Sequence, residues 1–266
     1  MLRGYESWYR SVMHRFLAFL LVVPMVAACG GASADDTTQL TVFAGSSLTA
    51  AFTDRIGPNF EAAHEGATVV FNFGASDSLA AQIQSEGAAD VFASASGTWM
   101  DAVEEDPGVS DRTDFVQNRL VIITPTDNPA GIASLDELTA SGVQLVLAAE
   151  GVPVGDYSRE ALDNAGILAD AVANIVSNEE DNASVVAKIT AGEADAGIVY
   201  ESDISAAAGN DVAAIEIPGD TNVIATYPIA VVTGAPDADL AAEFVAYVTG
   251  PEGQAALTEY GFEPIT

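Results

Sequence analysis

Apolar residues follow two different periods along the chain after residue 40. Short apolar runs, bounded by Gly, Pro, Asn or Asp, alternate with longer segments whose apolar residues recur every three or four positions. The short runs predict strands near 40–45, 67–73, 90–95, 119–125, 143–149, 173–177, 196–200, 213–217 and 226–233. The longer segments predict helices at 47–63, 76–86, 97–105, 134–141, 156–165, 183–191, 201–208, 236–248 and 251–259. Strands that alternate with helices indicate an α/β fold with mainly parallel sheets.

Two of these strands are predicted to cross between domains. The run 119–125 follows a polar, acidic loop, and the run 227–232 follows the turn Gly219-Asp-Thr-Asn222. We therefore expect two doubly wound α/β domains joined by two hinge strands, domain I from 40–120 plus 228–266 and domain II from 121–227. Two connecting strands would let the domains close around a ligand.

The first 29 residues have the pattern of a lipoprotein signal peptide. The apolar run Phe16–Val26 follows three arginines and is too short for a comfortable transmembrane helix. It ends in Val26-Ala-Ala-Cys29-Gly30, which resembles a bacterial lipobox, so Cys29 is predicted to carry the lipid. The alternative is a plain signal peptide that contains a cysteine. Translation could begin at Met1 or Met13.

Residues 30–39 are small and polar, as in a flexible tether. With the predicted lipid on Cys29, this tether would place the protein on the extracytoplasmic face of the cell membrane.

The charge balance excludes nucleic acid as a partner. Eight Lys and Arg residues stand against 39 Asp and Glu, a formal charge of −31, whereas binding to a phosphate backbone requires a basic surface. Anionic headgroups would repel the same surface, so membrane attachment depends on the lipid. The single cysteine excludes an internal disulfide, and His64 alone after the signal makes a bare transition-metal cation site improbable.

Four predicted turns lead from a strand into a helix through small or hydroxyl residues. A helix start leaves backbone N–H groups without an intrahelical acceptor, and the helix dipole favours an anion there. Helix capping alone would also explain each turn taken singly. The carboxyl ends of neighbouring strands gather in one place, so the turns could share one oxyanion. They are Gly45-Ser46-Ser47, Phe73–Leu79, Glu150–Tyr157 and Asn178–Ser184.

Three acidic residues beside these turns leave two possibilities for the ligand. Asp77, Asp156 and Asp181 either point outward as caps, or one of them accepts a proton from a ligand such as hydrogen phosphate. A fully deprotonated oxyanion, such as molybdate or sulfate, offers no proton and requires only donors around it.

Seven sequence segments in this order resemble molybdate-binding proteins of bacterial ABC transporters, which are type II periplasmic binding proteins. The resemblance covers nearly all of 40–264. The segments are Val42-Phe-Ala-Gly-Ser-Ser-Leu48, Phe73-Gly-Ala-Ser-Asp-Ser-Leu-Ala80, Ala89-Asp-Val-Phe-Ala-Ser94 with Trp99-Met-Asp101, Val152-Pro-Val-Gly155, Gly197-Ile-Val-Tyr-Glu-Ser-Asp203, Tyr227-Pro-Ile-Ala-Val-Val232, and Gly250-Pro with Tyr260-Gly-Phe262.

The resemblance implies a site made of neutral donors only. It assigns two serine hydroxyls to Ser47 and Ser76, two backbone amides to Val154 and Asn182, and one tyrosine hydroxyl to Tyr200. It also implies molybdate or tungstate as ligand, no cofactor, an ABC permease with its ATPase as partners, and a monomer. The chain departs from the family pattern at Asp77, where a serine is common.

Other functions remain open at this stage. One is a binder of the same architecture for phosphate or sulfate. A remote alternative is an extracytoplasmic hydrolase with a serine nucleophile, but His64 lies in a helix away from all four turns and no G-x-S-x-G motif exists, so we expect no enzyme. Ferric iron would require paired tyrosines. Trp99 and Met100 are expected to pack on a helix face, and Ser46 to shape the first turn.

Overall fold

The computed structural model describes residues 37–204 and 212–265. The predicted signal peptide with Cys29, residues 30–36 of the predicted tether and residues 205–208 of one predicted helix lie outside the described residues. The strands are β1 (Thr38–Gly45), β2 (Ala67–Gly74), β3 (Val91–Ala93), β4 (Val109–Pro125), β5 (Leu145–Ala148), β6 (Ile175–Glu179), β7 (Ala196–Tyr200), β8 (Val212–Glu216), β9 (Ile224–Val232) and β10 (Glu263–Pro264).

The helices fall close to the predicted segments. They are η1 (Ser46–Leu48), α1 (Thr49–Ala51), η2 (Phe52–Ile56), α2 (Gly57–Ala63), α3 (Ser76–Glu86), α4 (Gly97–Glu105), η3 (Leu135–Thr139), α5 (Pro153–Asn164), α6 (Leu168–Val172), α7 (Asn182–Thr190), α8 (Glu201–Asp203), α9 (Ala238–Thr249) and α10 (Pro251–Glu259). The predicted helix at 134–141 is the short 3-10 turn η3, and α6 was not predicted. No helix in the described parts of the chain has the length and apolar character that a membrane crossing requires.

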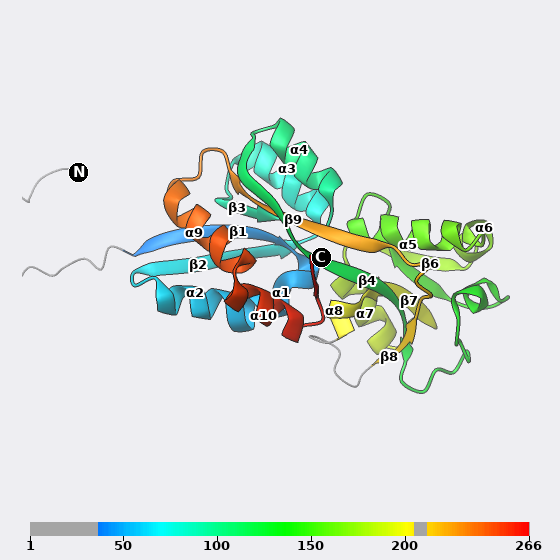
Figure 1. Cartoon of the computed structure of the whole chain (residues 1–266). Coiled ribbons are helices and arrows are strands. Elements are labelled where there is room, and N and C mark those ends of the chain that lie inside the picture. The colour runs from blue at the N-terminus through cyan, green and yellow to red at the C-terminus, as the bar shows by residue number, and fades with distance from the viewer. Residues whose placement is uncertain (1–36, 205–211, 266) are drawn as a thin grey trace, which may run out of the picture. The chain divides into compact units, whose positions relative to one another are not determined.

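The strands form one mixed sheet in the order β2-β1-β3-β9-β4-β7-β5-β6, with β8 and β10 paired to β4. Pairs within β1–β3 and within β5–β7 are parallel, whereas every pairing of β4 and β9 is antiparallel. The expectation of mainly parallel sheets was therefore wrong for the middle of the sheet. β4 and β9 lie side by side there and run through it (Figure 1).

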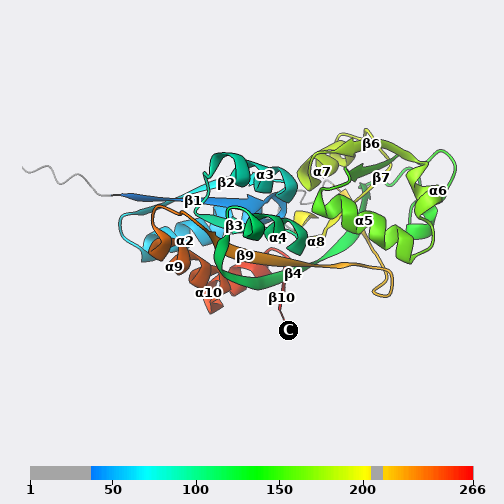
Figure 2. The ribbon, with the colours of Figure 1, turned by 90° about the horizontal axis from the view of Figure 1, so that it is seen from above.

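Helices cover both faces of the sheet. Strand β1 lies between β2 and β3, so the chain moves in one direction across the sheet from β1 to β2 and in the opposite direction from β2 to β3. Because both crossovers have the same hand, their helices lie on opposite faces of the sheet. Helices α3 and α4 lie over one face and α2, α9 and α10 over the other, and α5 and α7 flank β5 and β7 in the same way (Figure 1, Figure 2).

Alternation along β1 divides its side chains between two apolar clusters. Val42 and Ala44 face the larger cluster with Phe52, whereas Phe43 faces the smaller cluster with Met100. This alternation is the period of two that a strand imposes. Because both faces of β1 are packed in this way, the orientation of the strand and the position of the turn Ser46–Leu48 that follows it are fixed.

Strand β4 begins ten residues earlier than predicted. The polar, acidic stretch before Arg119 pairs with β9, and the ladder has register shifts between Ser110 and Thr113 and between Asp114 and Val116. Most side chains from Ser110 to Asp114 are exposed, so this half lacks the apolar run that identifies a buried strand from sequence.

Two prolines explain the local shapes of helices near the turns. Residues 46–63 are helical throughout, as predicted, but Phe52–Ile56 forms a π-helical turn just before Pro58. Pro58 has no N–H to donate, and its ring pushes away the carbonyl one turn earlier. Helix α5 begins at Pro153 and not at 156, because proline is favoured in the first helical turn.

Candidate functional site

The four predicted turns meet around one cavity. Its volume is about 10 Å³, roughly the space in which one water molecule fits. All five residues predicted as ligand contacts line it, and no charged side chain does. The lining residues are Gly45, Ser46, Ser47, Gly74, Ala75, Ser76, Ala95, Val152, Pro153, Val154, Asn182 and Tyr200.

The parallel strands bring these turns together. Gly45 at the end of β1 lies in register with Gly74 at the end of β2, so η1 and α3 start next to one another. From the other half of the sheet, α5 follows β5, α7 follows β6, and Tyr200 ends β7. The cavity thus lies at the carboxyl ends of the strands, where doubly wound sheets bind ligands.

Both predicted serine hydroxyls are buried and held by a second group. Ser76 Oγ accepts a hydrogen bond from the Ala95 N–H at 2.9 Å, which leaves the Ser76 proton free to be donated elsewhere. Ser47 Oγ lies 2.9 Å from the hydroxyl of Tyr227 on β9. Tyr227 was not predicted to act at the site.

A chain of polar groups connects Ser46 with Asp203. Ser46 Oγ donates a hydrogen bond to Asn182 Oδ1, and Asn182 Nδ2 donates to Asp203 Oδ1 at 2.5 Å. The other carboxylate oxygen of Asp203 accepts the Tyr200 N–H at 3.0 Å. Asp203 therefore fixes both Asn182 and the backbone of Tyr200. Asp203 ends the segment Gly197–Asp203 of the family resemblance, but no role was predicted for it.

Tyr200 presents a buried phenol at the cavity. It is 1% exposed, its ring packs edge-on to Tyr227 with centroids 5.8 Å apart, and its hydroxyl has no hydrogen bond of regular geometry among the described residues. Burial, and then the neighbouring Tyr227, raise the pKa of Tyr200 well above its usual range, and burial likewise raises the pKa of Tyr227. Both phenols are protonated at neutral pH and can donate.

The three acidic residues beside the turns do not line the cavity. Asp181 caps α7 by accepting the Ser184 N–H at 2.7 Å, and Asp156 accepts the Gly151 N–H at 2.8 Å. One oxygen of Asp77 is buried without a hydrogen-bond partner among the described residues. The walls of the cavity are consequently neutral.

Trp99 reaches the third turn from α4. Its indole Nε1 donates a hydrogen bond to the Gly151 carbonyl at 2.8 Å. Trp99 packs against the cluster under α4 and Met100 is fully buried in it, as expected, but the indole hydrogen bond to Gly151 was not predicted. The indole bond spans 52 positions in sequence, and no local pattern indicates it.

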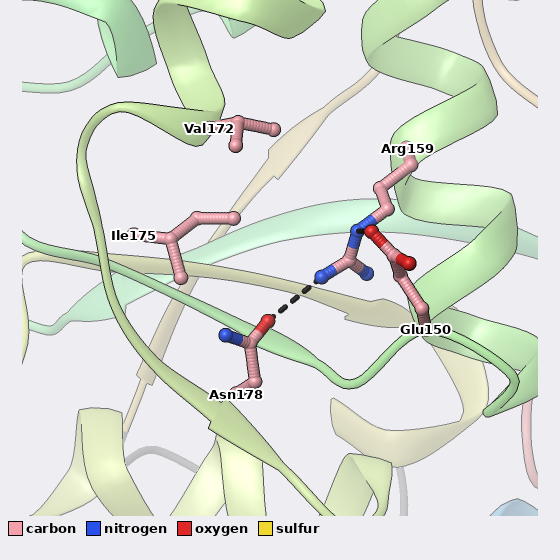
Figure 3. Close-up of a pocket in the computed structure, with 5 residues that line it drawn as sticks. All are labelled: Glu150, Arg159, Val172, Ile175 and Asn178. Atoms are coloured by element: carbon pink, nitrogen blue, oxygen red, sulfur yellow. Dashed lines mark hydrogen bonds and ion pairs between the residues drawn. The ribbon is translucent and has the colours of Figure 1, made fainter.

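A second, larger hollow of about 380 Å³ is lined by Arg159, whose guanidinium is already bound to other groups of the protein. The Arg159 guanidinium donates to Asn178 Oδ1 and lies 3.7 Å from Glu150 (Figure 3). It also donates to the carbonyls of Ala148 and Gly155. These contacts tie α5 to β5 and β6. The hollow shares no lining residue with the cavity at the turns.

His64 lies away from the cavity. Its ring stacks on Phe60 with centroids 3.9 Å apart, and its nitrogens contact the Phe60 carbonyl and Glu243. Within residues 37–204 and 212–265, no group of three or more His, Cys, Asp or Glu side chains is placed to hold a metal ion.

Comparisons with known proteins agree on one family. Residues 40–263 match the model of the family described as bacterial extracellular solute-binding protein. The "Molybdate-binding protein ModA" of Mycobacterium tuberculosis is 35% identical over 255 residues, covering 92% of this chain and 95% of the relative. The Bacillus subtilis "Putative ABC transporter substrate-binding lipoprotein YvgL" is 28% identical, with 96% and 97% covered.

A solved structure extends the agreement to the fold. It is the "substrate binding domain of putative molybdenum ABC transporter from Clostridium difficile", which is 27% identical to this chain. It covers 86% of this chain and 99% of its own, with a TM-score of 0.67.

The burial of Asp203 predicts a pH-dependent stability. Burial raises its pKa to about 7, above the value of about 3.9 that a carboxyl group has in an unfolded chain. Between these values the folded state keeps a proton that the unfolded state has released, so this group's contribution to the free energy of unfolding falls as the pH rises. In urea denaturation between pH 5 and 8, the slope of the free energy of unfolding against pH should be more positive in Asp203→Asn than in the wild type, by up to one proton or roughly 1 kcal/mol per pH unit.

Asp136→Asn is the matched control, because it removes one exposed carboxyl group that does not line the cavity. Equal slopes for wild type and Asp203→Asn would contradict the prediction.

Proposed function

The chain belongs to the bacterial extracellular solute-binding protein family, and on this premise we propose that it captures molybdate, and also tungstate, for an ABC permease and its ATPase. The α/β fold class and the resemblance that the sequence segments predicted are confirmed by the matches. Relatives described as molybdate-binding support the choice of ligand. We infer that the protein acts as a transport component and not as an enzyme.

The observation that carries the proposal is the neutral lining of the cavity. Four helix starts and four hydroxyl-bearing residues converge on it, and no carboxylate or cationic side chain lines it. Helix N-termini stabilise negative charge, and a nearby carboxylate would repel a dianion by roughly twice 4 kcal/mol at a separation of about 4 Å. Donors without acceptors suit an oxyanion that carries no proton.

Each predicted contact has a defined part in this proposal. Ser47, Ser76 and Tyr200 donate hydroxyl protons, and Val154 and Asn182 donate backbone N–H groups from the first turns of α5 and α7. Hydrogen bonds to a charged group are shorter and stronger than neutral ones. Five such donors together replace the hydration of the ion.

The lining weighs against the alternatives. Hydrogen phosphate would require a carboxylate to accept its proton, and none lines the cavity. Sulfate shares the charge and shape of molybdate and differs mainly in size, so it remains the second candidate. A serine hydrolase would require a base, and the lining contains no histidine.

We propose that two domains close over the ligand, domain I from 40–120 plus 228–266 and domain II from 121–227. β4 and β9 are the strands that connect these two parts. The Ser46–Asn182 and Trp99–Gly151 hydrogen bonds join groups from opposite parts. A cavity of about 10 Å³ admits a five-atom oxyanion only if its walls first move apart.

We also propose that Cys29 carries a lipid that holds the protein on the extracytoplasmic face of the membrane. The lipobox-like segment before Cys29 and the lipoprotein relative support this. With a formal charge of −31, the protein would gain nothing from anionic headgroups.

The first prediction concerns affinity and specificity. Titration calorimetry should show tight molybdate and tungstate binding and weak sulfate binding by the wild type. Ser47→Ala removes one hydrogen bond to a charged ligand, worth about 1.5–3 kcal/mol, so the Kd for molybdate should rise about 10- to 150-fold. Ser85→Ala, an exposed serine, should leave the Kd unchanged. Tighter sulfate or phosphate binding would reject molybdate as the ligand, and an unchanged Kd in Ser47→Ala would make Ser47 only a structural residue.

The second prediction concerns closure. Of the two tryptophans, Trp8 lies in the predicted signal peptide, so Trp99 is the sole tryptophan emitter after the signal. Molybdate should shift its emission to shorter wavelength, because closure forms the indole bond to Gly151 and shields the ring. Trp99→Phe should weaken binding by roughly 2- to 10-fold, the worth of one neutral hydrogen bond. A constant emission, together with a constant radius of gyration in X-ray scattering, would argue against closure.

The third prediction concerns the anchor. Cys29→Ala should release the protein from the membrane pellet and abolish its labelling by a radioactive fatty acid. Ser33→Ala, a neighbouring change in the tether, should leave both unaltered. Retention of Cys29→Ala in the membrane without label would point to a different attachment.

A further inference from the structure

Tyr227 lies directly behind Ser47 and does not line the cavity itself. Its side chain is fully buried on β9, and its hydroxyl is 2.9 Å from Ser47 Oγ. The two residues are 180 positions apart. A buried phenol at this place can decide which way the Ser47 proton points.

The polar groups around Tyr227 set the direction of its hydrogen bonds. Asn118 Oδ1 accepts the Arg119 N–H at 3.1 Å, so the Asn118 amide presents its NH₂ group to the interior. That NH₂ group donates to Ser202 Oγ at 2.8 Å and to Tyr227 Oη at 3.4 Å. Because Tyr227 Oη accepts from Asn118, its own proton is available for an acceptor on the cavity side.

Ser47 has one hydroxyl proton and can donate it in one direction only. If that proton went to Tyr227, the anion would meet the lone pairs of Ser47, which repel it. If Tyr227 donates to Ser47 Oγ, the serine proton is left for the anion. We propose that Tyr227 is a positioning residue that makes Ser47 a donor toward the bound oxyanion.

This inference rests on the proposed function, since it requires an anion in the cavity. In this proposal the series runs from Asn118 on β4, which donates to Tyr227 on β9, to Ser47 in the first turn, which accepts from Tyr227. Hydrogen bonds aligned in this way polarise one another in a buried environment. Tyr227 thereby strengthens a contact that it does not itself make with the ligand.

A double-mutant cycle on the full chain in detergent tests the proposal. Tyr227→Phe keeps the ring and removes the hydroxyl, and the Kd for molybdate should rise about 5- to 20-fold. In the Ser47→Ala background the same change should alter the Kd less than twofold, because there is no longer a proton to orient. A purely structural role would weaken binding equally in both backgrounds.

Tyr247→Phe is the matched control. Its hydroxyl is buried on α9 without a hydrogen-bond partner among the described residues, so its removal should leave the Kd unchanged. Thermal unfolding of every variant checks that each is folded.

Equal effects of Tyr227→Phe with and without Ser47, or no effect in either background, would overturn the inference. Titrating molybdate, tungstate, sulfate and phosphate separates this result from the proposed function. If the wild type prefers sulfate, the choice of molybdate fails while the cycle, measured with sulfate, still decides on Tyr227. A wild type that binds none of the four overturns both.

Discussion

The proposed function imposes one electrostatic constraint, which is to hold an anion without a cationic side chain inside a strongly acidic protein. With 39 acidic and eight basic residues, the whole chain opposes a negative ligand. The cationic side chains of the described residues are already paired with carboxylates, as in Arg55–Glu259, Arg112–Glu104, Arg119–Glu263, Arg159–Glu150 and Lys188–Glu193. Charge on a ligand must therefore be met by fixed dipoles, which the two parallel parts of the sheet supply by placing helix starts at their carboxyl ends.

Neutral donors act only if their protons point the right way, so the groups behind the cavity matter as much as its lining. Ser76 accepts from a backbone N–H, and Asn182 is held by Asp203. Asp203 keeps its carboxyl group one residue layer away from the cavity, where burial favours its protonated form. A negative charge on Asp203 would act against an anion, whereas its protonated form removes that cost while still ordering Asn182 and Tyr200.

The sequence predicted what local chemistry determines. Hydroxyl and small residues after apolar runs identified the turns at Ser47 and Ser76, and short apolar runs bounded by turn residues identified the buried strands. It did not predict the first half of β4, from Val109 to Asn118, because this half is a strand through its pairing with β9 and has no apolar run of its own. It also missed the roles of Tyr227, Asp203 and Trp99. Their contacts depend on where distant strands and helices come to lie, and no spacing along the chain encodes that.

In the proposed function, selection of an ion by its size depends on how the cavity closes. Ser46 bonds to Asn182 on one side, and Trp99 bonds to Gly151 on another. The cavity bounded by these two bonds has room for about one water molecule, so in the proposed function a bound oxyanion holds these walls further apart, and a larger ion separates them more. The donors themselves are alike for molybdate and sulfate, since both are tetrahedral dianions. In the proposed function, discrimination between the two ions therefore depends on the closure contacts more than on the donor set.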